Sequence, residues 1–139
     1  MNKFHKELNR LIRLGKYDII FMDGILLFED DKLTKMLDKK YFLHLEKNEC
    51  ARRRQSRNYI IADTSNYFDA CCWKEYLKYK QRCESNIKNI IYINGAEMPE
   101  KIFNFVANDI INYCSESNNI INNGNMNNNN KYIEEIEAL

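Results

Sequence analysis

Three short runs of apolar and β-branched residues set the main constraint on how this chain can fold. The runs are YDIIFM (17–22), YFLHLE (41–46) and IIYIN (90–94). Runs of this kind are typical of strands that are buried on both faces of a sheet. Segments with helical spacing of apolar residues lie around them, so we predict an α/β fold with a parallel sheet and flanking helices. The expected helices cover 3–14, 31–38 and 67–83, and a last helix begins at Pro99.

The length of the chain allows one domain, which we place at residues 1–114. The 139 residues hold 21 Lys and Arg against 20 Asp and Glu, a formal net charge of +1. This balance argues against a nucleic-acid partner and against a membrane surface. From Ser115 the chain becomes rich in asparagine, as SESNNIINNGNMNNNN. Such a stretch has too little apolar surface to offset chain entropy, so we expect residues 115–139 to form a disordered tail.

The cysteines indicate the compartment of the protein. There are five of them, no CxxC pair occurs, and only two histidines accompany them. These features argue against a disulfide framework and a zinc site, and they favour reduced thiols. The N-terminal segment lacks the apolar core of a signal peptide, although its basic residues leave an organelle transit sequence open. No apolar run is long enough to cross a bilayer. We therefore expect a soluble, cytoplasmic protein.

Four arginines cluster after the second expected strand, in the stretch CARRRQSRNY. We expect them on a helix, where Arg53 and Arg54 each share a face with Arg57. A solvated helix face and a phosphate or ribose clamp are both compatible with the cluster. There is a physical reason to expect a phosphate or ribose clamp, because clustered cations repel one another unless an anion lies among them. The nearest carboxylate, Glu49, cannot neutralise all four.

Three further residues are candidates for a ligand site. Asp23 directly follows the first expected strand, at the edge of a parallel sheet where ligands bind, and its carboxylate could hold Mg²⁺. The dipeptide Asp23–Gly24 is equally typical of a plain turn. Tyr59 and Asp63 follow the arginines and could contact a base and a ribose, although loops often carry such residues without a function.

Taken together, three stretches of the chain resemble the nicotinamide riboside kinases. They are DGILLF (23–28), YFLHLEKNECARRRQSRNY (41–59) and D-x3-YFD-x3-W-x2-YLKYK (63–80). Their order and spacing match that family, which belongs to the uridine kinase-like branch of the P-loop nucleoside kinases. The resemblance covers about residues 8–113. It implies a partial P-loop kinase fold with an arginine-bearing lid at about residues 48–66.

The activity that the resemblance implies is transfer of the γ-phosphoryl group of ATP to nicotinamide riboside, a step of NAD salvage. Arg53 and Arg57 match lid arginines that face the ATP phosphates, where they would offset the charge of the transferred group. Asp23 stands where the family carries an acidic residue near Mg²⁺. The implied partners are therefore a small nucleoside and ATP, with Mg²⁺ as the cofactor.

The resemblance also implies residues that contact the nucleoside. Arg54 and Tyr59 stand at nucleoside-contacting positions of the family, and Asp63 matches an acidic residue of the lid loop. In that loop, YIIAD replaces a stretch that usually contains proline. The expected substrate is nicotinamide riboside, and the alternative within the enzyme class is a pyrimidine nucleoside, uridine or cytidine.

One family motif is missing from the sequence. No G-x4-G-K-[ST] phosphate loop occurs in the 139 residues. That loop supplies the backbone N–H groups that hold the phosphates of ATP. We therefore expect the chain to represent the C-terminal portion of such a kinase and to be inactive by itself. An inactive binding module remains the alternative from another functional class.

Overall fold

A computed structural model describes residues 3–57 and 66–123 of the chain. These residues form two compact units, which are described one at a time. The first unit holds the chain up to Leu37 together with the part of the last helix from Ser117, and the second runs from Asp38 to Glu116. Within the described ranges, no helix has both the length and the apolar character needed to cross a membrane.

The first unit is built on the amphipathic helix α1 (Lys3–Leu14), as its apolar spacing predicted. Gly15 ends this helix with a φ of +57°, a conformation that glycine adopts without steric cost. A 3₁₀ turn, η1 (Leu27–Glu29), leads into the short helix α2 (Asp31–Met36), whose N-cap is Asp30. The buried core of the unit consists of Leu8, Leu11, Ile20 and Leu33.

The prediction of a strand at 17–22 is wrong. Only Met22 has strand-type pairing, and it does so as an isolated bridge. Ile20 is nevertheless buried, while Phe21 is 46% exposed. Ile20, with Tyr17 and Met22 partly buried beside it, packs against apolar residues of α1 and α2, so part of the run is buried without neighbouring strands that would make it part of a sheet.

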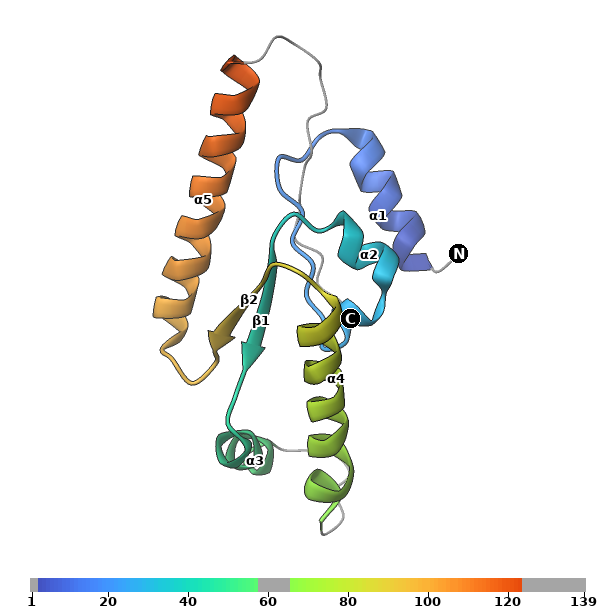
Figure 1. The fold of residues 1–139 in the computed structure, drawn as a ribbon, viewed down its shortest axis with the longest axis vertical. Coiled ribbons are helices and arrows are strands. Elements are labelled where there is room, and N and C mark those ends of the chain that lie inside the picture. Colours follow the sequence, from blue (N-terminus) through green and yellow to red (C-terminus); the bar gives the residue numbers. More distant parts are fainter. Residues whose placement is uncertain (1–2, 58–65, 124–139) are drawn as a thin grey trace. The chain divides into compact units, whose positions relative to one another are not determined.

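The second unit contains a parallel sheet of two strands, which are formed by two of the three predicted runs. Strand β1 (Lys40–His44) pairs with β2 (Ile90–Asn94), with Phe42 opposite Tyr92 and Leu43 opposite Ile93. The two arrows lie side by side and point the same way in Figure 1. Because side chains alternate between the faces of a sheet, Phe42 and Tyr92 share one face and Leu43 and Ile93 the other.

Helices cover both faces of this sheet. Helix α4 (Trp73–Asn86) lies on the face of Phe42, whose ring centroid is 5.9 Å from that of Tyr79. Helix α5 (Pro99–Asn123) lies on the opposite face. There Asp109 accepts hydrogen bonds from Lys39 Nζ at 2.9 Å and from the Tyr41 hydroxyl at 2.5 Å. Burial and this hydrogen bond both raise the pKa of Tyr41, so the phenol keeps its proton.

Two further helical elements of the second unit carry the arginines or lie near them. Helix α3 (Lys47–Gln55) follows β1, and a π-helical turn, η2 (Phe68–Cys72), precedes α4. The long helix expected from residue 67 is therefore present, but its first turn is π-helical. Helix α5 begins at Pro99 as predicted and continues beyond Ser115 to Asn123. Residues 124–139 lie outside the described part, so the assignment of a tail stays a prediction.

The fold is thus mostly helical with a parallel sheet of two strands among the described residues, which agrees with part of an α/β kinase fold. The arginine-bearing lid stays a prediction, because residues 58–65 lie outside the description.

Candidate functional site

The arginine helix α3 lies at the carboxyl end of the parallel sheet. It begins three residues after β1 ends at His44, beyond the arrowhead of β1 in Figure 1. Gly95, which directly follows β2, donates its N–H to the carbonyl of His44 at 2.8 Å. The carbonyl of Gly95 in turn accepts a hydrogen bond from Arg53 Nη1 at 3.0 Å. Through Arg53, these contacts attach α3 to the carboxyl end of the parallel sheet. Ligands bind at this end in open α/β sheets.

Glu49 neutralises two of the four arginines. Its carboxylate accepts bonds from Arg52 Nε and Nη2, both at 2.8 Å, and from Arg53 Nε at 2.6 Å. The bonds from Arg52 and then Arg53 lower the pKa of Glu49 to about 2. Glu49 is thus ionised at neutral pH, and it holds the first part of the cluster together.

Arg54 and Arg57 lie apart from this network. The guanidinium of Arg54 lies 5.9 Å from the centroid of the Tyr67 ring, a cation–π contact. Arg57 is exposed. The four arginines thus differ in their surroundings: Arg52 and Arg53 bond to Glu49, Arg54 contacts Tyr67, and Arg57 is exposed.

One detail of the predicted helix is wrong, because Arg57 does not lie on it. Helix α3 ends at Gln55; the C-cap residue Ser56 donates its N–H to the carbonyl of Arg52, and Arg57 donates its N–H to the carbonyl of Arg54, both at 3.2 Å. The Ser56 hydroxyl also donates to the carbonyl of Arg53 at 2.8 Å. These bonds satisfy the last carbonyl groups of the helix, so the chain turns before Arg57.

The structure does not relate the other predicted site residues to the arginines. Asp23 is exposed and belongs to the first unit, whereas the arginines belong to the second. Tyr59 and Asp63 lie outside the described residues. Within the described ranges, no three His, Cys, Asp or Glu side chains are grouped so that they could hold a metal ion. The roles expected for Asp23, Tyr59 and Asp63 stay predictions.

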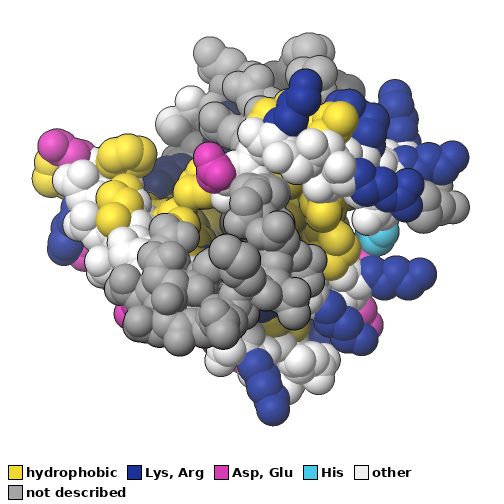
Figure 2. Space-filling view, turned by 90° about the horizontal axis from the view of Figure 1, so that it is seen from above, with side chains coloured by type: hydrophobic (Ala, Val, Ile, Leu, Met, Phe, Trp, Pro, Cys, Tyr) yellow, Lys and Arg dark blue, Asp and Glu magenta, His cyan; other side chains and the backbone are white. Residues whose placement is uncertain are grey.

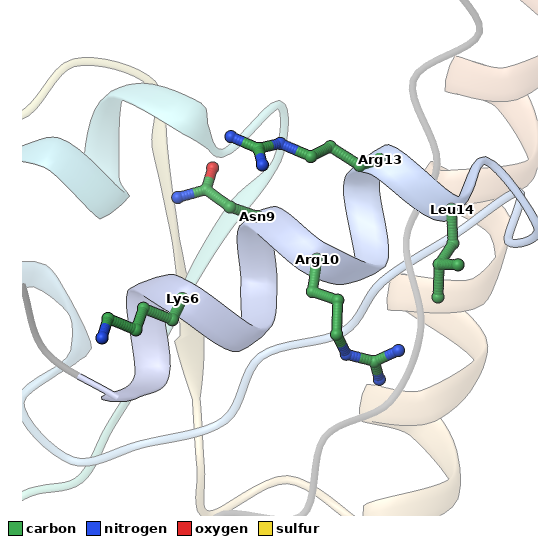
Figure 3. A pocket seen from close by; sticks show the side chains of 5 residues that line it. All are labelled: Lys6, Asn9, Arg10, Arg13 and Leu14. Atoms are coloured by element: carbon green, nitrogen blue, oxygen red, sulfur yellow. The ribbon is translucent and has the colours of Figure 1, made fainter.

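The first unit carries a basic hollow that was not predicted. Five residues of α1 line this open cavity of about 550 Å³, namely Lys6, Asn9, Arg10, Arg13 and Leu14 (Figure 3). Lys6, Arg10 and Arg13 recur at helical spacing opposite the buried side of α1, which is the signal that could have revealed them. Arg10 is engaged by Glu7 at 2.5 Å. Many other Lys and Arg side chains are visible at the surface in Figure 2, so a basic hollow does not by itself mark a site.

Two residues near the arginines escaped prediction. Tyr67 is the first residue of the helix expected at 67–83; it is 43% exposed and contacts Arg54. Gly95 directly follows the predicted strand at 90–94. A Cβ atom there would lie 3.2 Å from the carbonyl oxygen of His44, so the close approach of the two loops favours glycine. Neither role has a local sequence signal, because both depend on contacts between segments distant in the chain.

Comparison with known proteins gives several related sequences, although no protein-family model matches the chain. Nicotinamide riboside kinase 2 of Mus musculus is 34% identical over 113 residues, which are 80% of this chain and 58% of that protein. Nicotinamide riboside kinase 2 of Homo sapiens is 35% identical over 94 residues, 68% of this chain and 41% of the relative. Nicotinamide riboside kinase 1 of Homo sapiens is 36% identical over 93 residues, 67% of this chain and 47% of the relative. The chain spans about half the length of these relatives.

Proposed function

Because this chain belongs to the nicotinamide riboside kinase family, we propose that it serves the ATP-dependent phosphorylation of nicotinamide riboside to nicotinamide mononucleotide. The observation that carries the proposal is the arginine helix at the carboxyl ends of two parallel strands, tied there by the bond from Arg53 to Gly95. Phosphoryl transfer needs cations that offset the charge on the moving group, and it needs little other chemistry from the protein.

Arg53 and Arg57 are the residues that we propose for the phosphates. Arg53 uses Nε for Glu49 and one Nη1 hydrogen for Gly95. A guanidinium has about five N–H donors, so these two bonds leave Arg53 donors for phosphate oxygens. Its orientation is already restricted, which lowers the entropy cost of binding an anion. Arg57 is exposed and beyond the helix end, so its guanidinium can reach a ligand without breaking an ion pair with Glu49.

Arg54 is the residue that we propose for the nucleoside. Its guanidinium lies against the ring of Tyr67. A guanidinium carries about five N–H donors in a planar fork, a geometry that suits the hydroxyl groups of a nucleoside. Tyr59 and Asp63 are proposed for the same substrate on the resemblance alone.

Mg²⁺ is the cofactor that we propose with ATP. Asp23 is an exposed carboxylate and could hold it directly or through water. Mg²⁺ sites of kinases use one or two carboxylates together with the substrate phosphates, so a single acid fits this requirement. When bound, the ion would neutralise charge on the phosphates, while the residues of this chain orient them.

The first experiment concerns the protein as the cell makes it. The endogenous protein would be captured with an antibody against residues 67–86, its intact mass measured, and its turnover of nicotinamide riboside, uridine and cytidine compared with ATP and Mg²⁺. We expect turnover of nicotinamide riboside. Turnover of uridine and cytidine alone would show a pyrimidine nucleoside kinase. Nucleoside binding without any turnover would show a binding module, the reading favoured by the missing G-x4-G-K-[ST] motif.

Arg54→Ala tests the site within that enzyme. Loss of a charged hydrogen bond to the substrate should lower kcat/KM for nicotinamide riboside roughly 10- to 100-fold. Arg52→Ala is the matched control, because Arg52 is exposed and engaged by Glu49. We expect Arg52→Ala to change kcat/KM less than about twofold. An unchanged kcat/KM in Arg54→Ala would remove Arg54 from the site.

A further inference from the structure

Helix α3 is positioned by contacts at its surface, because it buries no side chain. At its first residue, Lys47 Nζ lies 2.5 Å from Asp69 Oδ1. Further along the helix, the guanidinium of Arg54 lies 5.9 Å from the centroid of the Tyr67 ring. Both partners belong to the segment that leads into α4, and the start of α4 lies beside α3 in Figure 1. Two contacts thus join one helix to one short segment.

The two contacts lie on one face of α3. At about 100° of rotation per residue, Lys47 and Arg54, which are seven positions apart, point within about 20° of each other. Arg53 points about 100° away from Arg54, and on that side its Nη1 donates to the carbonyl of Gly95 at 3.0 Å. The helix is therefore held at two faces, so a rotation about its axis would break a contact on one face or the other.

The place of Lys47 in the helix gives the ion pair an electrostatic reason. Lys47 is the first residue of α3, where the helix dipole is positive and a cation is unfavourable. The carboxylate of Asp69 offsets both positive charges. The acidic residue of the first turn, Glu49, is engaged by Arg52 and Arg53. Asp69 is thus a carboxylate from outside α3 that neutralises the start of the helix.

Aromatic contacts connect the segment of Asp69 to the sheet. Ring centroids are 6.1 Å apart for Phe68 and Trp73, 4.9 Å for Trp73 and Tyr76, and 6.3 Å for Tyr76 and Phe42 of β1. In an α-helix, residues five positions apart point about 140° away from each other, whereas the wider π-helical turn brings them closer, in agreement with the contact of Phe68 with Trp73. Asp69, next to Phe68, therefore presents its charge from a segment that ring contacts fix to β1.

We propose that Asp69 is a positioning residue for the arginine cluster. It holds Lys47 and so fixes the rotation of α3 about its axis. That rotation sets the direction in which Arg53 and Arg54 present their N–H groups to a ligand. The consequence for phosphoryl transfer rests on the proposed function, whereas the effect of Asp69 on the orientation of α3 does not.

Charge reversal in the 139-residue chain tests the effect on orientation. In Asp69→Lys two cations face each other, so we expect the backbone NMR shifts of α3 to move along the helix. The double variant Lys47→Glu/Asp69→Lys restores a pair of opposite charges, so the shifts of residues 51–55 should return. Glu75→Lys is the matched control, because it reverses a similarly exposed pair with Lys78 in α4 and should leave the shifts of α3 unchanged.

The ring of Tyr67 offers a second pair of variants. Tyr67→Phe keeps the aromatic face that Arg54 contacts and should leave the shifts of α3 unchanged, whereas Tyr67→Leu removes that face and should move them. The urea midpoint of unfolding should be the same in the charge variants, because exposed ion pairs contribute little to stability. A change in orientation without a change in stability separates positioning from a merely structural role.

Kinase activity is the second readout. In the protein as the cell makes it, kcat/KM for nicotinamide riboside should fall about tenfold in Asp69→Lys, less than the roughly 100-fold that a displacement of about 1 Å can cost, and should return to within about twofold in the double variant. Unmoved α3 shifts in Asp69→Lys, shifts that the double variant does not restore, or an unchanged kcat/KM despite moved shifts would each overturn the proposal. If the unaltered protein turned over no nucleoside, the proposed function would fail, and the NMR comparison would still decide the role of Asp69.

Discussion

Helix α1 buries Leu8 and Leu11 beneath its basic surface, whereas helix α3 buries no residue at all. Both helices are rich in Lys and Arg. Removal of apolar surface from water therefore holds α1 in place, whereas polar contacts connect α3 to its surroundings. These are the bond from Arg53 to Gly95 and the ion pair of Lys47 with Asp69, while the bonds from Arg52 and Arg53 to Glu49 lie within the helix.

This difference indicates which of the two basic surfaces can exchange its ion-pair partners when a ligand binds. Exposed ion pairs contribute little free energy and can exchange partners. A phosphate can thus compete with Glu49 for Arg53 at low cost, whereas nothing comparable displaces Leu8 from its core. The weakly held helix is also the one at the carboxyl end of the sheet, where we propose that phosphates bind, and binding segments generally have low local stability.

The largest expected effect is a loss of stability when the buried side of α1 is altered. Leu8 is 3% exposed, so Leu8→Ala should lower the free energy of unfolding by about 2–5 kcal/mol through lost burial and a cavity. Urea unfolding followed by circular dichroism measures the change. The matched control is Leu14→Ala at the 42% exposed end of the same helix, for which we expect less than about 0.5 kcal/mol. Equal losses in both variants would mean that burial does not hold α1.

A smaller effect is expected from Glu49→Gln in α3. The folded-state pKa of Glu49 is lowered from 4.5 to about 2, so its bonds stabilise the helix fully above pH 4.5 and are lost as the pH falls towards 2. Backbone NMR shifts of α3 should show this loss of helicity in the unaltered chain. In the Glu49→Gln variant, α3 should be less helical already at pH 7, and its shifts should not show the loss of helicity between pH 4.5 and 2. Glu75→Gln, which removes a similar pair with Lys78 in α4, should keep the step in α3.

The smallest expected effect is that of added salt on the NMR shifts of α3. Raising NaCl to about 0.5 M shortens the screening distance and weakens exposed ion pairs. The NMR shifts of α3 should move, because Arg52 and Arg53 are largely exposed, while those of α1 should stay. If α1 responded as strongly as α3, its Arg10–Glu7 pair rather than its core would position it.

Segments with a strong local pattern were predictable from the sequence. The apolar spacing of residues 3–14 is confirmed as α1, the run IIYIN as β2, and Pro99 as the start of α5. Local preferences decide these cases because burial, backbone geometry and capping act within a few residues. The same holds for the cluster of arginines and its place after a strand, which the sequence shows directly.

Long-range contacts decided the rest. Whether YDIIFM became a strand depended on neighbouring strands, and contacts with α1 and α2 buried it instead. Which carbonyl Arg53 reaches depended on the fold bringing Gly95 to α3, whereas the pairs of Glu49 with Arg52 and Arg53 follow from helical spacing. The helix expected from residue 67 begins with a π-helical turn, which the spacing of its residues does not reveal. The sequence alone determined the residues available for chemistry, whereas their partners were set by backbone geometry and by the packing of distant segments.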